Sequence, residues 1–415
     1  MKTIRLAVLN THPIQYFAPF YRVLDQSPLI EPTVLYLSDV SLRGGRDPGF
    51  GLSVSWDIDL LDGYASRFIG AAQARTPRGF FSLIAPGLWP ELTSGRYDAV
   101  LIHGHNFAAN WIALAAARAA GLTVLARGDS HADLERGGLK AALRRPIVRA
   151  FYHACHRYLA IGSRNAAFYR DLGMPADRIV LAPFAVDNER FAAARRQGAG
   201  ERARTRARHG IDADRPAVLF VGKLTPQKRP ADLIEAMARL RAQTDARCSL
   251  VFCGSGELEA ELRGRCAGAG LDKVVFTGFV NQAALPGLYA AADIFAFPAD
   301  GEESWGLAVN EAMAAGLPVV VSRQVGCAAD LVVDGVNGFL PQTGDIDAWS
   351  QALGRLVASP ALRAAQGRAS AEQISSWSYR ECLDGFHRAL EGAVAPPMAA
   401  RRDDRRAAAL TAAGR

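Results

Sequence analysis

The chain of 415 residues is 50% hydrophobic and 21% charged, a composition that excludes a disordered, collagen-like or disulfide-scaffold protein. Its length predicts two or three domains. The net charge is +7, but residues 195–208 contribute +5 and residues 393–415 contribute +3, so the rest of the chain carries −1. A nearly neutral body argues against a nucleic-acid-binding surface, and no nucleic acid is expected as a partner.

The cysteines and apolar segments indicate a cytoplasmic protein. Six cysteines occur without Cys-x-x-Cys pairs or a histidine at zinc-finger spacing, which indicates reduced structural thiols. The first ten residues lack the charged leader and cleavage site of a signal peptide. The longest apolar stretch, residues 107–126, is interrupted by Asn110, Arg118 and Gly121, so we expect no membrane span.

Short apolar runs alternate with longer helical stretches along the chain. Runs rich in Val, Ile and Leu with little polar alternation indicate parallel sheets covered by helices on both faces. The predicted strands are residues 4–9, 33–37, 99–102, 123–126, 158–161 and 179–181 in the first half, and 217–221, 249–252, 274–276, 294–297 and 319–321 in the second. The pattern predicts an α/β fold with two doubly wound, Rossmann-like domains. The glycine-rich residues 43–51 predict a flexible loop.

Composition shifts mark the expected domain limits. We expect an N-terminal domain over residues 1–190 and a C-terminal domain over residues 215–375. The Arg- and Ala-rich residues 191–214 have no apolar stripe, so they predict an exposed, mobile basic linker, although Arg and Ala both favour helix. Residues 376–392 have apolar positions at helical spacing, and the low-complexity residues 393–415 predict a disordered tail.

The segment after the predicted strand 294–297 is the most informative about chemistry. A polar loop containing Glu303 leads into a helix that begins at about Gly306. The free amides of Gly306 and Leu307, with the helix dipole behind them, predict a phosphate-binding site. Glu303 and Glu311 flank these amides and suit sugar hydroxyls on both sides of a phosphate, because carboxylates accept hydrogen bonds. The alternative is a solvated loop glutamate and a surface helix glutamate.

A second polar cluster follows the predicted strand 217–221. Gly222, Lys223 and Lys228 lie in the loop after this strand, at the edge where open α/β sheets bind ligands. Two of the five lysines of the chain occur here, among 43 arginines. A compact ammonium charge suits a pyrophosphate whose negative charge grows as it leaves. The alternative is an ordinary solvated turn.

With these residues the chain resembles retaining glycosyltransferases of the GT-B fold, family four, also called glycosyl transferases group 1. The resemblance rests on Glu-x7-Glu followed by Ala-Met-Ala-x-Gly-x-Pro-Val-Val from Glu303 to Val320, and on the Gly-Lys-x4-Lys element that ends at Lys228. It implies two Rossmann-like domains facing each other across a cleft. It also implies a nucleotide diphosphate sugar as donor, with no metal and no other cofactor. Residues 376–392 resemble the helix that crosses back to the N-terminal domain.

The resemblance assigns roles to individual residues. The implied donor-binding residues are Gly222, Lys223, Lys228, Gly306, Leu307 and Glu311. Among them the lysines bind the diphosphate, the amides of Gly306 and Leu307 hold the distal phosphate, and Glu311 accepts hydrogen bonds from the ribose. The loop at residues 278–280 lies near the base.

Glu303 is the implied catalytic residue in contact with the transferred sugar. The family often places a supporting histidine after the fourth strand of the N-terminal domain. Here Arg127 and Gly128 stand at that place, and His131 is the candidate three residues later. The first loop also departs from the family, because Asn10-Thr-His-Pro replaces the usual glycine pair. Other histidines at strand ends, including His12, are more often structural.

The implied function is retaining transfer of a sugar to a hydroxyl of a carbohydrate, lipid-linked or other acceptor, in polysaccharide, glycolipid or glycoconjugate biosynthesis. Two alternatives stay open: a GT-B epimerase-type enzyme, and a non-catalytic sugar-nucleotide-binding protein. The stretch 139–158, with Lys140 and four arginines among apolar residues, leaves open a peripheral contact with an anionic membrane at the inner face. The competing interpretation is an ordinary surface helix.

Overall fold

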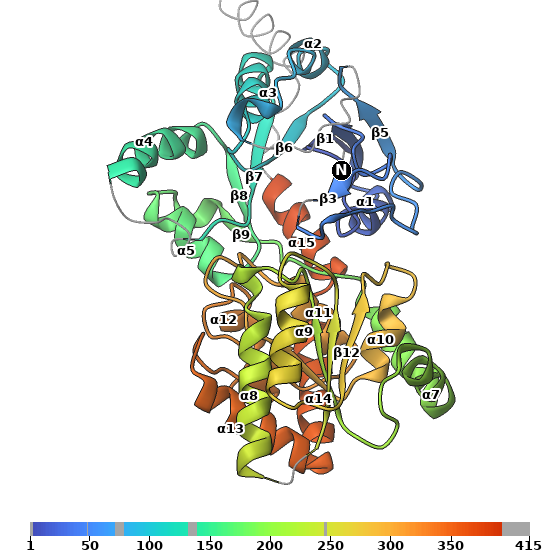
Figure 1. Ribbon diagram of the computed structural model, residues 1–415. Helices are drawn as coiled ribbons and strands as arrows, with labels where there is room; N and C mark the ends of the chain where they lie inside the picture. Colours follow the sequence, from blue (N-terminus) through green and yellow to red (C-terminus); the bar gives the residue numbers. More distant parts are fainter. Residues whose placement is uncertain (1–2, 48, 71–78, 132–138, 245–246, 392–415) are drawn as a thin grey trace, which may run out of the picture.

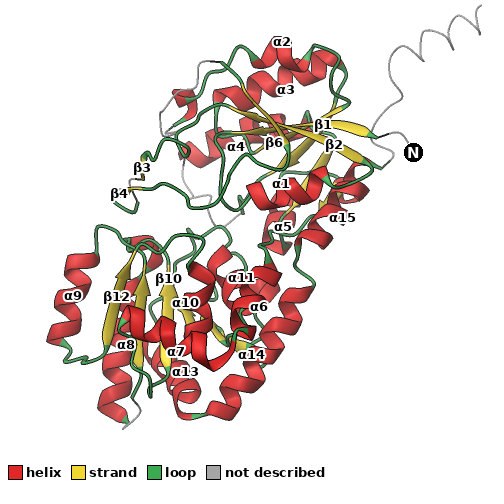
Figure 2. Ribbon diagram, turned by 90° about the vertical axis from the view of Figure 1, so that its right-hand side faces the viewer, coloured by secondary structure: helices red, strands yellow, loops and turns green. Residues whose placement is uncertain are grey.

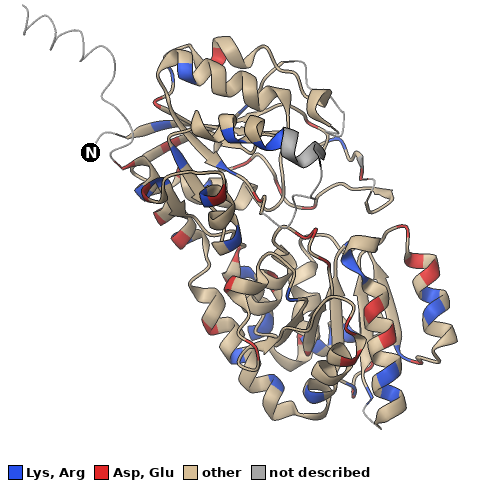
Figure 3. Ribbon diagram, turned by 90° about the vertical axis from the view of Figure 1, so that its left-hand side faces the viewer, with Lys and Arg blue, Asp and Glu red and all other residues tan. Residues whose placement is uncertain are grey.

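The computed structural model of the chain has two α/β domains, one above the other, each built on a parallel sheet with helices against it (Figure 1). This confirms the predicted fold class. The residues that the structure describes are 3–47, 49–70, 79–131, 139–244 and 247–391. The predicted disordered tail lies outside them. Figure 3 shows basic and acidic residues interspersed over both domains, as a nearly neutral body requires.

The N-terminal domain contains all six strands predicted for the first half. Its strands are β1 (Ile4–Asn10), β2 (Ile30–Tyr36), β3 (Arg46–Asp47), β4 (Leu52–Ser53), β5 (Ala65–Phe68), β6 (Ala99–His103), β7 (Thr123–Arg127), β8 (Arg157–Ala160) and β9 (Ile179–Leu181). Its helices are α1 (Ala18–Asp25), α2 (Leu88–Leu92), α3 (Ala108–Ala120), α4 (Leu139–His153) and α5 (Ser163–Asp171), with 3-10 turns η1 (Phe80–Ser82) and η3 (Ala176–Arg178). The seven-stranded sheet has the order β5-β2-β1-β6-β7-β8-β9. Edge strand β5 escaped prediction because it is short and only half-buried, without an apolar run.

The C-terminal domain likewise contains all five predicted strands. Its strands are β10 (Ala217–Val221), β11 (Ser249–Cys253), β12 (Val274–Gly278), β13 (Ile294–Phe297), β14 (Val319–Val321) and β15 (Gly338–Phe339). The remaining helices are α6 (Asn188–Arg196), α7 (Gly198–His209), α8 (Pro230–Gln243), α9 (Glu259–Gly268), α10 (Leu285–Ala291), α11 (Leu307–Ala314), α12 (Ala328–Leu331), α13 (Ile346–Ala358), α14 (Pro360–Ser375) and α15 (Tyr379–Leu390), with the 3-10 turn η4 (Pro226–Lys228). The six-stranded sheet has the order β12-β11-β10-β13-β14-β15.

Parallel pairing brings the carboxyl ends of all strands in a sheet to one edge. Within β1, Ala7 is in register with Thr33 of β2 and Val100 of β6. Successive residues of β1 face opposite layers of the core, so Leu9 packs in one apolar cluster and Val8 in another. The domain is thus covered on both faces, as its continuous apolar strands require.

Helix α15 returns from the C-terminal domain and packs against the N-terminal domain (Figures 1 and 2). It begins with a capping box, in which Ser378 and Glu381 bond to each other's backbone amides. Its apolar side buries Cys382, Phe386 and Leu390 among side chains of β1, β6 and β7. The end of the described chain therefore ties the two domains together.

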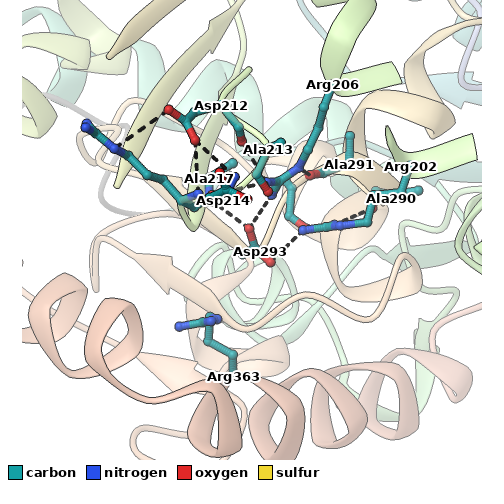
Figure 4. Close-up of polar contacts among 12 residues, drawn as sticks. Arg202, Arg206, Asp212, Ala213, Asp214, Ala217, Ala290, Ala291, Asp293 and Arg363 are labelled. Carbon is teal, nitrogen blue, oxygen red and sulfur yellow. Dashed lines mark hydrogen bonds and ion pairs between the residues drawn. The ribbon is translucent and has the colours of Figure 1, made fainter. Parts of the chain in front are cut away.

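Residues 191–214 were expected to be an exposed, mobile linker; most of them are exposed or partly exposed, but they are folded into helices and are not a free linker. These residues form most of α6 and all of α7, which pack against α10. Arg202 and Arg206 donate to both oxygens of Asp293, at 2.7 and 2.5 Å, and to the last carbonyls of α10 (Figure 4). Only 5% of Arg206 is exposed. The stretch needs no apolar stripe, because its guanidinium groups satisfy a carboxylate and the negative end of a helix.

Replacing Arg206 should expose how much this contact stabilises the domain. Asp293 also accepts from the amide of Ala217 at the start of β10, so Arg206→Ala leaves this partly buried carboxylate with Arg202 as its cation and removes a donor from the carbonyl of Ala291. We expect Arg206→Ala to lower the free energy of unfolding by about 3 kcal/mol in chemical denaturation. The matched control is Arg204→Ala on the same helix, whose side chain is 74% exposed, with a change below about 0.5 kcal/mol. Equal, small effects of both substitutions would contradict the anchoring role.

Candidate functional site

A cavity of about 450 Å³ lies between the two domains, where strands of both sheets end. Six of the eight predicted site residues line it: Gly222, Lys223, Lys228, Glu303, Gly306 and Leu307. The N-terminal domain supplies the opposite wall, which includes His12, Gln15, Tyr16, Asp47, Phe50 and Trp56. The remaining two predicted residues, Glu311 and His131, do not line it.

The N-terminus of α11 forms one wall of the cavity. Gly306 precedes the helix with a φ of 94°, a left-handed conformation that glycine adopts without strain. A side chain at this position would also crowd Val325 and Phe297, because its Cβ would lie 3.1 and 3.2 Å from atoms of these two residues. No side chain caps this helix end. The first amides of the helix therefore face the cavity together with the positive end of its dipole.

Lys228 and Glu303 form an ion pair at this end of the cavity. Lys228 lies in the turn after β10, and Glu303 in the loop before α11. The ammonium group also lies 5.1 Å from the centre of the Phe297 ring. Burial and the nearby Lys223 ammonium lower the pKa of Lys228 to about 8, against the opposing attraction of Asp300. The residue is therefore positively charged at neutral pH and close to its titration range.

Lys223 is held by a carboxylate that sequence reasoning missed. Its Nζ lies 2.9 and 3.0 Å from the two carboxylate oxygens of Asp47, which belongs to β3 of the other domain. It also lies 4.9 Å from the centre of the Phe50 ring. Residues 43–51 were expected to be a flexible loop, and nothing in their glycine-rich composition indicated a contact more than 170 positions away.

Glu311 lies beneath the cavity rather than in its wall. It is one turn further along α11 than Leu307, and only 1% of it is exposed. The hydroxyl of Tyr289 donates to its carboxylate at 2.7 Å. Burial raises the pKa of Glu311 to about 7, against the opposing effects of this hydrogen bond and of Arg190. The surface-helix alternative is therefore wrong, and the predicted ribose contact stays a prediction.

The histidines at the strand ends differ in their surroundings. His12 lines the cavity, bonds through Nδ1 to Thr11 at 2.9 Å, and has its pKa lowered to about 4, chiefly by burial and against the attraction of Asp47. Burial, with the nearby Arg127 charge, lowers the pKa of His103 to about 3. His131, the catalytic candidate, is 1% exposed and lies outside the cavity wall. Of these three, His12 is placed to contact a ligand.

Two further expectations concern metals and membranes. Within the described ranges, no group of three or more His, Cys, Asp or Glu side chains is placed to hold a metal ion. That no metal is needed stays a prediction. No described helix has both the length and the apolar character needed to cross a bilayer. Helix α4 runs through Pro146 and exposes Arg144, Arg145 and Arg149, while its other side buries Phe151.

Sequence comparisons identify the kind of protein that has this arrangement. The profile of Glycosyl transferases group 1 matches residues 201–373, and that of Glycosyltransferase Family 4 matches residues 62–190. A D-inositol 3-phosphate glycosyltransferase of Xylanimonas cellulosilytica is 34% identical over 318 residues, which are 74% of this chain and 71% of that protein. A GDP-mannose-dependent alpha-(1-6)-phosphatidylinositol monomannoside mannosyltransferase of Mycolicibacterium smegmatis is 34% identical over 50% of this chain, and the match spans 54% of that protein.

Solved structures share the fold. HepE of Anabaena, crystallised with UDP and glucose, superposes with a TM-score of 0.70 at 17% identity, over 94% of this chain and 100% of that one. The sucrose-phosphate synthase of Thermosynechococcus elongatus superposes with a TM-score of 0.67 at 19% identity, over 94% of this chain and 100% of that one. At these identities the likeness is one of fold.

The buried carboxyl of Glu311 should make stability depend on pH. Its folded-state pKa of about 7 lies above the ordinary glutamate value of 4.5, so the folded protein keeps a proton that the unfolded chain loses. The stability contributed by this group therefore falls as the pH rises from about 4.5 through 7. Glu311→Gln keeps an acceptor for Tyr289 and removes the charge. Denaturant titrations at pH 5 and pH 8 give the free energy of unfolding of the variant and of the wild type. We expect the difference, variant minus wild type, to be larger at pH 8 than at pH 5 by up to roughly 3 kcal/mol.

Glu372 in α14 provides the control, because Glu372→Gln makes the same substitution at an exposed position outside the cavity wall. Its unfolding free energy should follow that of the wild type at both pH values. If the free energy of unfolding of Glu311→Gln changes with pH as that of the wild type does, the raised pKa of Glu311 is wrong.

Proposed function

Because the chain belongs to the family 4, group 1 glycosyltransferases, we propose that it transfers a sugar from a nucleotide diphosphate sugar to an acceptor hydroxyl, with retention of anomeric configuration. One observation carries the proposal. The N-terminus of α11, the two lysines and Glu303 meet at one cavity between the domains. A cationic, amide-rich site next to a carboxylate suits a diphosphate that leaves from a sugar.

The diphosphate occupies the cationic end of the cavity in this proposal. The amides of Gly306 and Leu307 hold the distal phosphate, and Lys223 and Lys228 take up the negative charge that develops as the glycosidic bond breaks. Both ammonium groups lie in a cleft that is only partly open to water, so their field is screened less than on an open surface. These side chains and the helix end supply the positive potential that the leaving group requires.

Glu303 is proposed to position the transferred sugar. Its carboxylate is in contact with Lys228, next to the helix end where the distal phosphate would lie. Of the described residues that line the cavity, the carboxylates are Asp47 and Glu303, and each is paired with a lysine. This supports a front-face route. The bond from the sugar C1 to the phosphate oxygen breaks, the acceptor oxygen bonds to C1 on the same face, and the acceptor proton passes to the released diphosphate.

The nucleoside is proposed to lie toward β11 and β12. Cys253, Gly254 and Phe279 line the cavity there, in or just after these strands. Gly254 allows a close backbone approach, since a Cβ would collide with the carbonyl oxygen of Gly222. Glu311 would take the ribose hydroxyls from below Leu307. The acceptor, a carbohydrate, lipid-linked or other hydroxyl compound of polysaccharide, glycolipid or glycoconjugate biosynthesis, would enter along the wall that carries His12.

Incubation with nucleotide sugars and candidate hydroxyl acceptors tests the proposal, with donor consumption and the anomeric configuration of the product read by NMR. We expect Glu303→Gln to lower kcat by about 100-fold, because the sugar loses its positioning carboxylate. Glu372→Gln, the exposed control outside the cavity wall, should retain nearly full activity. Inversion of configuration would overturn the retaining route, and full activity of Glu303→Gln would overturn the role of that residue.

The pH dependence of kcat/KM should report Lys228. Only its protonated form attracts the diphosphate, and its pKa is about 8, so kcat/KM for the donor should fall roughly tenfold per pH unit above pH 8. Lys228→Arg should move this fall to higher pH, because a guanidinium stays charged. Lys273→Arg, outside the cavity wall, is the matched control and should leave the profile unchanged. A wild-type profile that stays flat to about pH 9.5 would contradict the assignment.

A further inference from the structure

The N-terminal domain reaches across the cleft through a loop that carries β3 and β4. Figure 2 shows these two short strands extending from the upper domain toward the lower one. We call residues 45–57, apart from residue 48, the bridging loop. Its two strands pair antiparallel, with Asp47 in register with Leu52. The loop touches the segments that follow β10, β11 and β12, which are neighbours in the sheet of the C-terminal domain.

Polar contacts dock the bridging loop at several points besides the Lys223 ion pair. Ser255, after β11, donates from its hydroxyl to the carbonyl of Phe50 at 2.8 Å. Asn281, after β12, donates from Nδ2 to the carbonyl of Ser55 at 2.7 Å. The amide of Ala283 donates to the carboxylate of Asp57 at 3.0 and 3.1 Å. The loop therefore has a defined position over the half of the cavity where the nucleoside is proposed to lie.

Three aromatic rings meet where the bridging loop crosses this half of the cavity. The rings of Phe50 and Trp56 lie edge-on to the ring of Phe279, with centroid distances of 5.1 and 5.9 Å. All three side chains line the cavity and are only partly buried. Phe279 lies in the loop at residues 278–280, the segment expected near the base. A cavity wall of partly exposed rings suits the apolar face of a planar base, which stacks on aromatic side chains.

Asp47 is paired with Lys223, a lysine that the proposed function assigns to the donor diphosphate. Its carboxylate accepts from Nζ of Lys223 and also from the amides of Gly49 and Phe50, the latter two at 2.8 and 3.1 Å. Gly49 lies so close that a Cβ would stand 2.6 Å from Cδ of Lys223. Burial would raise the pKa of Asp47, but the hydrogen bond and charge of Lys223, with the two amides, hold it below its ordinary value. The protein's own carboxylate is thus paired with Lys223, which is proposed to bind a phosphate.

We propose that the bridging loop is the second half of the nucleotide-binding site. Phe50 and Trp56 bind the base together with Phe279, and Asp47 holds Lys223 in place until the donor diphosphate displaces it. The inference rests on the proposed use of a nucleotide diphosphate sugar. It goes further by assigning base recognition in part to the N-terminal domain and by making diphosphate binding an exchange of one anion for another.

Substitutions in the loop should have effects of opposite sign on nucleotide binding. Phe50→Ala removes part of the aromatic wall and should weaken binding of a nucleoside diphosphate about tenfold, with Trp56→Ala acting in the same direction. Asp47→Asn keeps the oxygen that accepts from the Gly49 and Phe50 amides but removes the competing charge. It should tighten binding by up to about fivefold. A loop that merely supports the fold would weaken binding in both cases.

Calorimetric titration of the full chain with UDP, GDP and ADP tests this. The control is Phe81→Ala, because Phe81 is 75% exposed and lies outside the cavity wall. Its affinity should equal that of the wild type. Circular dichroism and the melting temperature establish that each variant is folded, and Trp56→Ala replaces Phe50→Ala if the latter is not.

The outcomes separate the two proposals. If the wild type binds none of the three nucleotides, the proposed function fails and this inference fails with it. If the wild type binds one of them and the aromatic variants bind it equally well, the proposed function stands and the bridging loop has no part in the site. Weaker binding by Asp47→Asn would overturn the displacement of Asp47.

Discussion

The cavity between the domains holds two ammonium groups, each paired with a carboxylate. These pairs determine how the cavity can bind an anion. Lys223 faces Asp47 from the other domain, and Lys228 faces Glu303 from the loop before α11. A diphosphate that enters such a cleft does not add charge to an empty site. It competes with anions that are already there, so its affinity is the difference between two sets of ion pairs. The uncapped end of α11 adds positive potential that no side-chain cap neutralises.

Contacts within the C-terminal domain and contacts between the two domains hold these groups in place. Asp293 gathers Arg202, Arg206 and the first residue of β10, so the strand that leads to both lysines starts from a fixed point. Helix α15, which follows the C-terminal domain in the chain, buries its apolar side in the N-terminal domain and thereby links the two domains. The bridging loop links the two domains a second time, through its contacts with the C-terminal domain. The cavity therefore depends on contacts that cross the domain boundary in both directions.

Sequence patterns predicted the parts of this structure that local physics determines. The buried parallel strands were found because they are continuous apolar runs, and the start of α11 because a glycine follows a polar loop at a strand end. The same patterns were silent on contacts between distant segments. Asp47 and Lys223 are far apart in the chain, and the glycine-rich segment around Asp47 gives no local reason for a fixed position.

The expected mobility of residues 191–214 was wrong for a related reason. The absence of an apolar stripe predicts exposure, but Arg206 is buried through hydrogen bonds to a helix end and a carboxylate. Glu311 shows the same limit, since its place after Glu303 in the sequence does not reveal that it is buried and accepts a hydrogen bond from Tyr289.

A crystal structure of the protein with a bound nucleoside diphosphate would show whether the two lysines and the start of α11 hold the diphosphate. We expect the distal phosphate to accept from the amides at the start of α11 and from Lys228, and Lys223 to have left Asp47 for the diphosphate. A diphosphate bound elsewhere, with Lys223 still on Asp47, would contradict this expectation.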